Sequence, residues 1–465
     1  MLSLIRKLAP DRHAVLDDWR VKAKEFADHH LRPRALEIDK RCKADPTYID
    51  WDLLKAAAPY GFLSTLVPKG MGGAGEGCTA LALVMEELCV ACPGIANIFG
   101  AHGLGVSAIL LGFDVYHYDR VLKEMAEAER KGAPIIFAAA ITEPLAGSDV
   151  EDAEFLRTAR LITEATPVPG GYRLNGRKVF ISNGSVAEIT AVVAPTDKRR
   201  PVETQSAFVV RKGTPGFSVG RVEEKMGMKA CPAAELIFED CFIPKENIIG
   251  QEGQGVRLTE LVLGGSRAPV GAVATGIARG ALERTIEFAK NKKLGGKRLL
   301  DQQWVQIKLA EMGRKIQLAR QAYLVSALTF DLFGAPKLMQ NPAARLLLDV
   351  MPAPLRTNAM ANGVIRSDTT QSMMASVLDR LLDEKDARRI QRHASMAKVS
   401  GGDTAVEVTY EALQIVGLEG SLQRYELEKL YRDAKLTQIY EGTNQLNRHN
   451  IYSNGFLEEG MGHQG

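Results

Sequence analysis

The sequence is poor in cysteine, has almost no excess charge and contains no long uninterrupted apolar run. Six cysteines in 465 residues do not make a disulfide scaffold, and neither the cysteines nor the histidines have the spacing of a metal site. The 59 basic residues nearly balance 56 acidic ones, which leaves a net charge of +3. So small a charge excludes recruitment of nucleic acid or of an anionic membrane by a strong overall field.

Apolar runs are also too short for a membrane protein. None reaches the roughly eighteen residues that cross a bilayer, and the opening MLSLIRKLAPDRH has too short an apolar stretch for a secretory signal. We therefore expect a cytoplasmic protein with no membrane insertion, no nucleic-acid partner and no metal. A chain of this length with 46% hydrophobic and 25% charged residues has the make-up of two or three domains, each with its own core.

The spacing of apolar residues divides the chain into three parts. Residues 1–134 carry apolar positions three and four apart, which predicts a helical domain. Residues 135–249 alternate instead, which predicts a β domain, and Asn175-Gly176 is predicted to form a hairpin turn because this dipeptide tolerates positive φ. The helical period returns over residues 250–465 and indicates a bundle. This order predicts an α+β fold.

A proline-rich segment at about residues 334–388 interrupts the predicted bundle and ends in a charged helix. We interpret it as an insertion of one or two extra helices. It could cap the bundle, or it could provide a surface for a partner or a lid over a pocket.

Four stretches carry the chemical information. They are AAAITEPLAGSDV (138–150), KVFISNGSVAE (178–188), AAELIFEDCFIPKENIIGQEGQG (233–255) and LEKLYRDAKLTQIYEGTNQLNRHNI (427–451). In order and spacing they resemble the acyl-CoA dehydrogenase family, and the resemblance covers nearly the whole chain outside the insertion. It implies an N-terminal helical domain, a central antiparallel β domain and a C-terminal helical bundle. It also implies an FAD enzyme that desaturates an acyl-CoA thioester between its α and β carbons.

The resemblance assigns FAD contacts to the second domain. The amide of Ile141 and the side chain of Thr142 would meet the pyrimidine edge of the flavin, and Ser148 would face the thioester ligand while contributing to the cofactor site. Phe180 and Ser182 would lie against the far side of the ring, where the family often has Trp and Thr. Both replacements keep a flat apolar wall and a hydrogen-bond donor near the reactive nitrogen.

Further FAD contacts are implied in the third domain. Thr443 and Gln445 match residues that touch the FAD of their own subunit, and Thr443 is a candidate helix cap. The residues implied to reach the cofactor of a neighbouring subunit are Lys292, Gln303, Gln414, Ile415 and Gly417. Lys292 stands where the family has Arg, so it supplies charge without the bidentate fork. The resemblance implies a homotetramer built as a dimer of dimers.

Glu441, in I-Y-E-G-T, matches the catalytic base of most family members. The α-hydrogen of a thioester is a very weak acid, so its removal needs a carboxylate in a dry site. Some members carry the base on a helix directly before an arginine that matches Arg267, but this chain has Ser266 there, which leaves Glu441 without a rival. Arg267 would orient the base region or bind near the substrate, and Gly442 is assigned to the substrate site.

The segment matching the acyl pocket, residues 95–104, is apolar, contains small residues at Gly100, Ala101 and Gly103, and has no Arg or Lys. A buried acyl carboxylate would need a cationic partner, so we expect an uncharged acyl group, with room for a branched or cyclic one. In the implied mechanism Glu441 removes the α-proton while hydride leaves the β-carbon for flavin N5. By analogy, an electron-transferring flavoprotein would reoxidise the enzyme.

Three alternatives remain open at this point. An acyl-CoA oxidase shares the chemistry but passes electrons to oxygen, and an enoyl-CoA reductase would run it in reverse. A protein of another class, a non-catalytic scaffold, would keep the fold and use the insertion to bind partners. The presence of Glu441 argues against the scaffold, since a scaffold has no need of a buried base.

Overall fold

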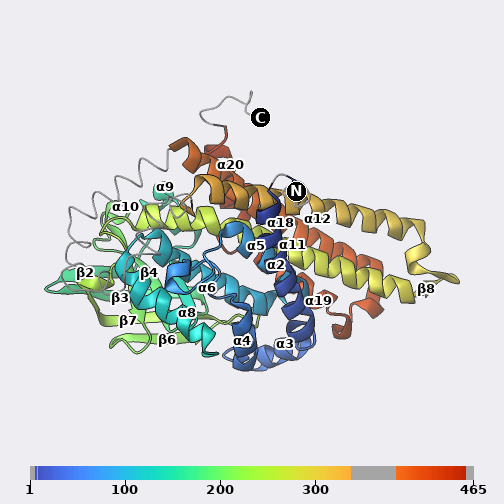
Figure 1. The fold of residues 1–465 in the computed structure, drawn as a ribbon, viewed down its shortest axis with the longest axis horizontal. Coiled ribbons are helices and arrows are strands. Elements are labelled where there is room, and N and C mark those ends of the chain that lie inside the picture. The colour runs from blue at the N-terminus through green and yellow to red at the C-terminus, as the bar shows by residue number, and fades with distance from the viewer. Residues whose placement is uncertain (1–5, 8, 337–383, 457–465) are drawn as a thin grey trace.

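The computed structural model describes residues 6–7, 9–336 and 384–456. Most of the predicted insertion at about 334–388 therefore lies outside the described residues. The described chain runs from helices through two β-sheets into long helices, with the sheets at one end of the molecule and the long helices extending to the other (Figure 1). The predicted α+β fold class is confirmed.

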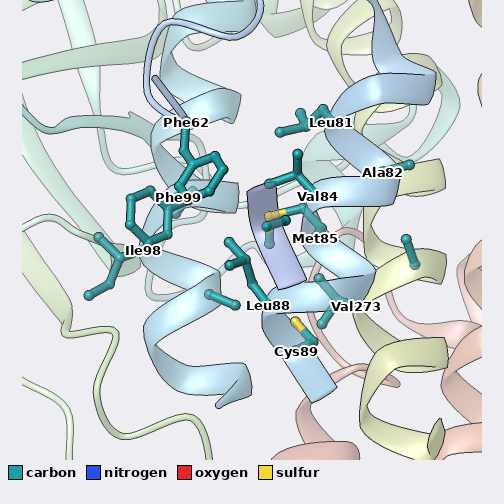
Figure 2. Packing of buried hydrophobic residues seen from close by; sticks show 14 of the residues in the cluster. Phe62, Leu81, Ala82, Val84, Met85, Leu88, Cys89, Ile98, Phe99 and Val273 are labelled. Carbon is teal, nitrogen blue, oxygen red and sulfur yellow. The ribbon is translucent and has the colours of Figure 1, made fainter. Parts of the chain in front are cut away.

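The first domain is built around two apolar helices. Its α-helices are α2 (Pro10–Phe26), α3 (Ala35–Ala44), α4 (Trp51–Ala57), α5 (Cys78–Ala91), α6 (Pro93–Leu111), α7 (Val115–His117) and α8 (Lys123–Arg130). Every residue of α5 is buried, because α6 covers one side of it and α11 of the third domain covers another. Figure 2 shows the contact, in which Leu88 and Met85 of α5 lie between Phe99 of α6 and Val273 of α11.

Two described helices, α6 and α11, are long and apolar enough by length and composition to cross a membrane. Neither is an uninterrupted apolar run, because polar residues such as Asn97 in α6 and Arg267 in α11 interrupt them. Of the apolar stretch that passes this test, 67% is buried in α6 and 83% in α11. Such burial is typical of the core helices of a folded domain.

The second domain contains two sheets and short helices. The first sheet has the order β1 (Phe137–Ala140), β4 (Ile189–Pro195), β5 (Gln205–Arg211), and the second β2 (Glu164–Val168), β3 (Gly171–Ser182), β7 (Ala233–Pro244), β6 (Phe217–Val222). The short helices are α9 (Ala153–Leu156) and α10 (Pro201–Thr204). All pairings are antiparallel except that of β1 with β4, which is parallel. The expected antiparallel β domain is confirmed, and this one pair departs from it.

The predicted hairpin at Asn175-Gly176 is wrong. Strand β3 passes straight through this dipeptide, which forms a bulge where the register against β7 shifts. The turn between β2 and β3 lies instead at Gly170, whose φ is +83°. Gly176 is needed for another reason: a Cβ atom there would lie 2.4 Å from the Cα atom of Thr163, so glycine permits a close approach of two chains.

The third domain is a bundle of α11 (Gly255–Asn291), α12 (Gln303–Phe333), α18 (Glu384–Gly420), α19 (Leu427–Leu436) and α20 (Asn444–Ser453). A small hairpin of β8 (Lys293–Leu294) and β9 (Lys297–Arg298) joins α11 to α12. Helix α11 packs along α5, α12 and α18 and so connects the bundle to the first domain. Helix α18 contains a break at Gly417, with φ 60° and ψ −160°.

A buried ion pair fixes the loop that follows β1. Lys178 Nζ of β3 lies 2.8 Å from Glu143 Oε1 and donates to the carbonyl of Ile141 at 2.8 Å. The other carboxylate oxygen, Oε2, accepts the backbone N–H groups of Ile162 at 2.6 Å and Thr163 at 3.1 Å. Both charged side chains are at most 1% exposed. Glu143 therefore holds the loop and is not available to a ligand.

Candidate active site

A cavity of about 970 Å³ lies where the three domains meet. Helices α5, α6 and α11 form much of its wall, and further residues come from α2, the loop before α5, the loop after β1, the end of β3, the end of α12 and the loop before α20. The predicted site residues among its lining are Ile141, Thr142, Phe180, Ser182 and Glu441. Segments up to three hundred residues apart in sequence are thus brought to one place.

The backbone of β3 turns Phe180 into this cavity. Pairing with β7 is interrupted between Lys178 and Ile181, and within this bulge Phe180 adopts a φ of +58°. Such a conformation is rare for a bulky residue. Its side chain is 61% exposed, although its neighbours Val179 and Ile181 are buried. The bulge therefore presents an aromatic face to the cavity, with Ser182 at the end of the strand beside it.

Glu441 lies on the turn between α19 and α20, directly before Gly442. Both residues have positive φ. The hydroxyl of Ser266 donates to Glu441 Oε2 at 2.7 Å, and Arg267 Nε donates to the Glu441 carbonyl at 3.3 Å. Burial raises the pKa of Glu441, while the Ser266 hydrogen bond and the charges of Arg267 and Lys398 oppose this. The net effect makes this carboxylate a stronger proton acceptor.

Arg267 is buried behind the Glu441 turn, with only 1% of its side chain exposed. Besides the Glu441 carbonyl it contacts Gln391 Oε1 at 3.2 Å and Glu151 Oε2 at 3.4 Å. Of the two roles expected for Arg267, this position matches the orientation of the base region, and Arg267 is not among the residues that line the cavity.

Thr443 caps α20, as the hydroxyl accepts from the backbone N–H of Leu446 at 3.2 Å. Its own backbone N–H donates to the hydroxyl of Ser148 at 3.2 Å, so these two predicted residues meet beside the cavity. Gln445 is exposed on the first turn of α20. Gly442 is buried between Glu441 and Thr443.

Besides Ser148, Thr443 and Gln445, five predicted FAD residues do not line this cavity: Lys292, Gln303, Gln414, Ile415 and Gly417. Lys292 ends α11 and forms an ion pair with Glu419, which links it to the end of α18. The hairpin that starts directly after Lys292 lies at the far end of the bundle from the sheets (Figure 1). Within one chain these residues therefore belong to a second region, and their contact with FAD stays a prediction.

From the sequence, His102 could be either a packing residue or a contact, and Glu151 was not singled out. His102 of α6 is buried, with Nε2 3.2 Å from the Leu63 carbonyl and Nδ1 accepting from the Phe137 backbone N–H at 3.0 Å. Burial lowers the pKa of His102 to about 4, so it is a neutral structural residue. Glu151 also lines the cavity, and Arg267 contacts both its carboxylate and the Glu441 carbonyl. The only sequence signal for it was its place three residues after Ser148.

The cavity fits a flavin. Phe180 offers a flat apolar face, Ser182 and Thr142 offer hydroxyls, and Ile141 and Thr142 lie on an irregular segment beyond the end of β1. The aromatic side chain stands exposed at a strained backbone position, which is the arrangement expected of a residue that covers a planar ligand.

Comparison with known proteins identifies the class. The acyl-CoA dehydrogenase N-terminal domain matches residues 16–129, the middle domain 138–241 and the C-terminal domain 253–350 and 350–455. The chain belongs to the acyl-CoA dehydrogenase family, and it is an FAD-dependent dehydrogenase.

Individual relatives agree with this assignment. Cyclohex-1-ene-1-carbonyl-CoA dehydrogenase of Syntrophus aciditrophicus is 34% identical over 425 residues, which cover 91% of this chain and 86% of the relative. The solved butyryl-CoA dehydrogenase of Megasphaera elsdenii is 29% identical with a TM-score of 0.73, over 94% of this chain and 97% of that one. A chain solved in work on the electron transferring flavoprotein of Acidaminococcus fermentans is 31% identical with a TM-score of 0.74, over 96% and 98%.

Proposed function

We propose that the protein catalyses α,β-dehydrogenation of an uncharged acyl-CoA to the trans-2-enoyl-CoA, with Glu441 as the base. The observation that carries this proposal is the shared cavity: a partly buried carboxylate of raised pKa lines the same space as the aromatic face of Phe180. A thioester between them would have its α-hydrogen on the carboxylate side.

The chain's own residues would act as follows. Glu441 takes the α-proton, and burial favours this because it disfavours the charged carboxylate. The hydroxyl of Ser266 fixes the position of that carboxylate by donating a hydrogen bond to Oε2. Arg267 fixes the turn by donating a hydrogen bond to the Glu441 carbonyl. The buried walls of α5 and α6 exclude water. Bound FAD supplies the acceptor for the two electrons that leave with the β-hydrogen.

For the acyl group we propose a bulky, ring-containing or branched chain. Gly100, Ala101 and Gly103 of α6 all line the cavity, and a Cβ atom on Gly103 would have Leu81 Cδ2 at 3.5 Å as its nearest neighbour, so the absence of a side chain leaves space there. The similarity to an enzyme named for a cyclohexene carbonyl thioester supports a cyclic acyl group. The small residues make the cavity wide at this point.

The test of the function is a panel of saturated, branched and cyclic acyl-CoA thioesters mixed anaerobically with the FAD-loaded protein. We expect loss of the yellow flavin absorbance with at least one uncharged thioester, and no bleaching with a dicarboxylic one. If no uncharged member of the panel bleaches the flavin at any chain length, the proposed function is wrong.

The same panel tests the acyl pocket through Gly103→Leu. The added side chain projects into the cavity, so we expect bleaching by cyclic thioesters to slow by about 10- to 100-fold, while short linear thioesters change little. Gly313→Leu is the matched control, because a Cβ atom on Gly313 of α12 meets nothing within 4 Å. Equal losses for cyclic and linear substrates would contradict the assignment of Gly103 to the pocket.

We further propose an electron-transferring flavoprotein as acceptor and a homotetramer as the working assembly. The neighbour solved in work on such a flavoprotein supports the first. The position of Lys292, Gln303, Gln414, Ile415 and Gly417 away from the cavity supports the second, since the family resemblance has these residues reach the cofactor of a neighbouring subunit. Light scattering should give a mass of about four chains, and a monomeric mass for the active protein would contradict this proposal.

A further inference from the structure

A second carboxylate stands beside the predicted base. Glu151 ends the 3-10 turn Ser148–Glu151, lines the cavity with Glu441, and accepts a hydrogen bond from the backbone N–H of Gly442. A Cβ atom on Gly442 would lie only 2.6 Å from Glu151 Oε2. The carboxylate of Glu151 is therefore packed directly against the turn that carries Glu441.

Charged groups surround this pair from two helices. From α11, the buried Arg267 reaches Glu151 Oε2 with Nη2 and the Glu441 carbonyl with Nε, at 3.4 and 3.3 Å. From α18, Lys398 is fully buried and donates to Asn444 Oδ1 at 2.7 Å, and Asp403 accepts from Nδ2 of that same Asn444 at 2.8 Å.

These groups titrate as a coupled cluster. Burial raises the pKa of Glu151 to about 7, with the charge of Arg267 opposing the shift and that of Glu441 adding to it. Burial lowers the pKa of Lys398 to about 7, and there the charge of Glu151 opposes the shift. The charge of Glu441 raises the proton affinity of Glu151, and by reciprocity an ionised Glu151 raises the proton affinity of Glu441.

We propose that Glu151 is a positioning residue whose ionised carboxylate, held by Arg267 and the Gly442 amide, strengthens Glu441 as a proton acceptor. The inference rests on the proposed function and deepens it. Glu151 forms no bond with the substrate in this role: it acts through Glu441, because a proton arriving on Glu441 relieves the repulsion between two negative charges. The binding of the acyl-CoA is then independent of Glu151.

The sign of the effect follows directly. Glu151→Gln removes the negative charge that Glu151 carries above about pH 7, which lowers the proton affinity of Glu441, so the acidic limb of the pH–rate profile moves to lower pH. Above that limb kcat falls roughly three- to tenfold, because a weaker base accepts the proton less readily. KM for the acyl-CoA and the flavin spectrum stay as in the native enzyme.

A second measurement does not depend on turnover. In the FAD-loaded protein without substrate, the infrared carbonyl band of protonated Glu441 is identified by its loss in Glu441→Gln. Its titration midpoint should fall in Glu151→Gln and in Glu151→Ser, and return toward the native value in Glu151→Asp, which restores the charge. The matched control is Glu154→Gln, an exposed carboxylate three residues further along the same segment, which should leave the midpoint unchanged.

The two hypotheses fail in different ways. If no acyl-CoA bleaches the native protein, the proposed function is wrong, and the infrared midpoint still decides the role of Glu151. If the midpoint is unmoved or rises in both charge-removing variants, or if their activity falls with an unshifted pH limb, Glu151 is a structural residue and the inference is overturned.

Discussion

Glu441→Gln should leave a folded, yellow protein whose flavin is reduced by acyl-CoA about 10²- to 10⁴-fold more slowly, with KM little changed. The amide keeps the size of the carboxylate and can still accept the hydrogen bond that Ser266 donates at 2.7 Å. It cannot accept the α-proton at any pH. Stopped-flow measurement of flavin bleaching, with a substrate that the panel has identified, gives the rate directly.

The control for this variant is Glu246→Gln, which removes an exposed carboxylate from the short turn after β7, outside the cavity lining. Its rate should equal that of the native enzyme. Bleaching of Glu441→Gln at more than a tenth of the native rate would show that another group takes the proton. Glu151, the cavity carboxylate that packs against the Glu441 turn, would then be the first candidate.

Lys178→Met should destabilise the protein by about 3–5 kcal/mol, because it leaves the carboxylate of Glu143 buried without its cation. The ion pair at 2.8 Å is almost fully buried, so solvent cannot replace the lost charge. Burial lowers the pKa of Lys178 and Glu143 opposes this shift, so the lysine depends on its partner in the same way. Urea unfolding followed by circular dichroism measures the change.

The double variant Lys178→Met with Glu143→Gln separates charge from packing. Without either charge, we expect recovery of more than half of the lost stability, since no uncompensated ion remains. A loss below 1 kcal/mol in the single variant would mean that the loop after β1 rearranges to hydrate Glu143. A double variant as unstable as the single one would assign the loss to packing.

The sequence was sufficient to predict the order of the domains and the family. Apolar periodicity gave the order of helices, strands and helices, and four stretches gave the family. Through that resemblance Ile141, Thr142, Phe180, Ser182 and Glu441 were expected at one site, and the structure brings them to one cavity.

What the sequence could not provide depends on contacts between distant segments. The Asn-Gly dipeptide favours a turn locally. In the fold, however, glycine is needed at position 176 because the backbone of Thr163 approaches it closely. The parallel pairing of β1 with β4 has no local signal at all. The importance of Glu151 arises only when α11 brings Arg267 to it, 116 residues further along. Burial of Lys178 against Glu143 likewise appears only in three dimensions.

The backbone conformation of Phe180 has a consequence for how the protein acquires its cofactor. A positive φ at a bulky residue costs roughly 1–3 kcal/mol, and here it belongs to the bulge that pairing with β7 forms in β3. The free-energy cost of this backbone conformation is therefore part of the free energy of folding, because the conformation arises when the sheet forms. An incoming isoalloxazine finds the ring already turned outward, so association requires no rearrangement of the strand.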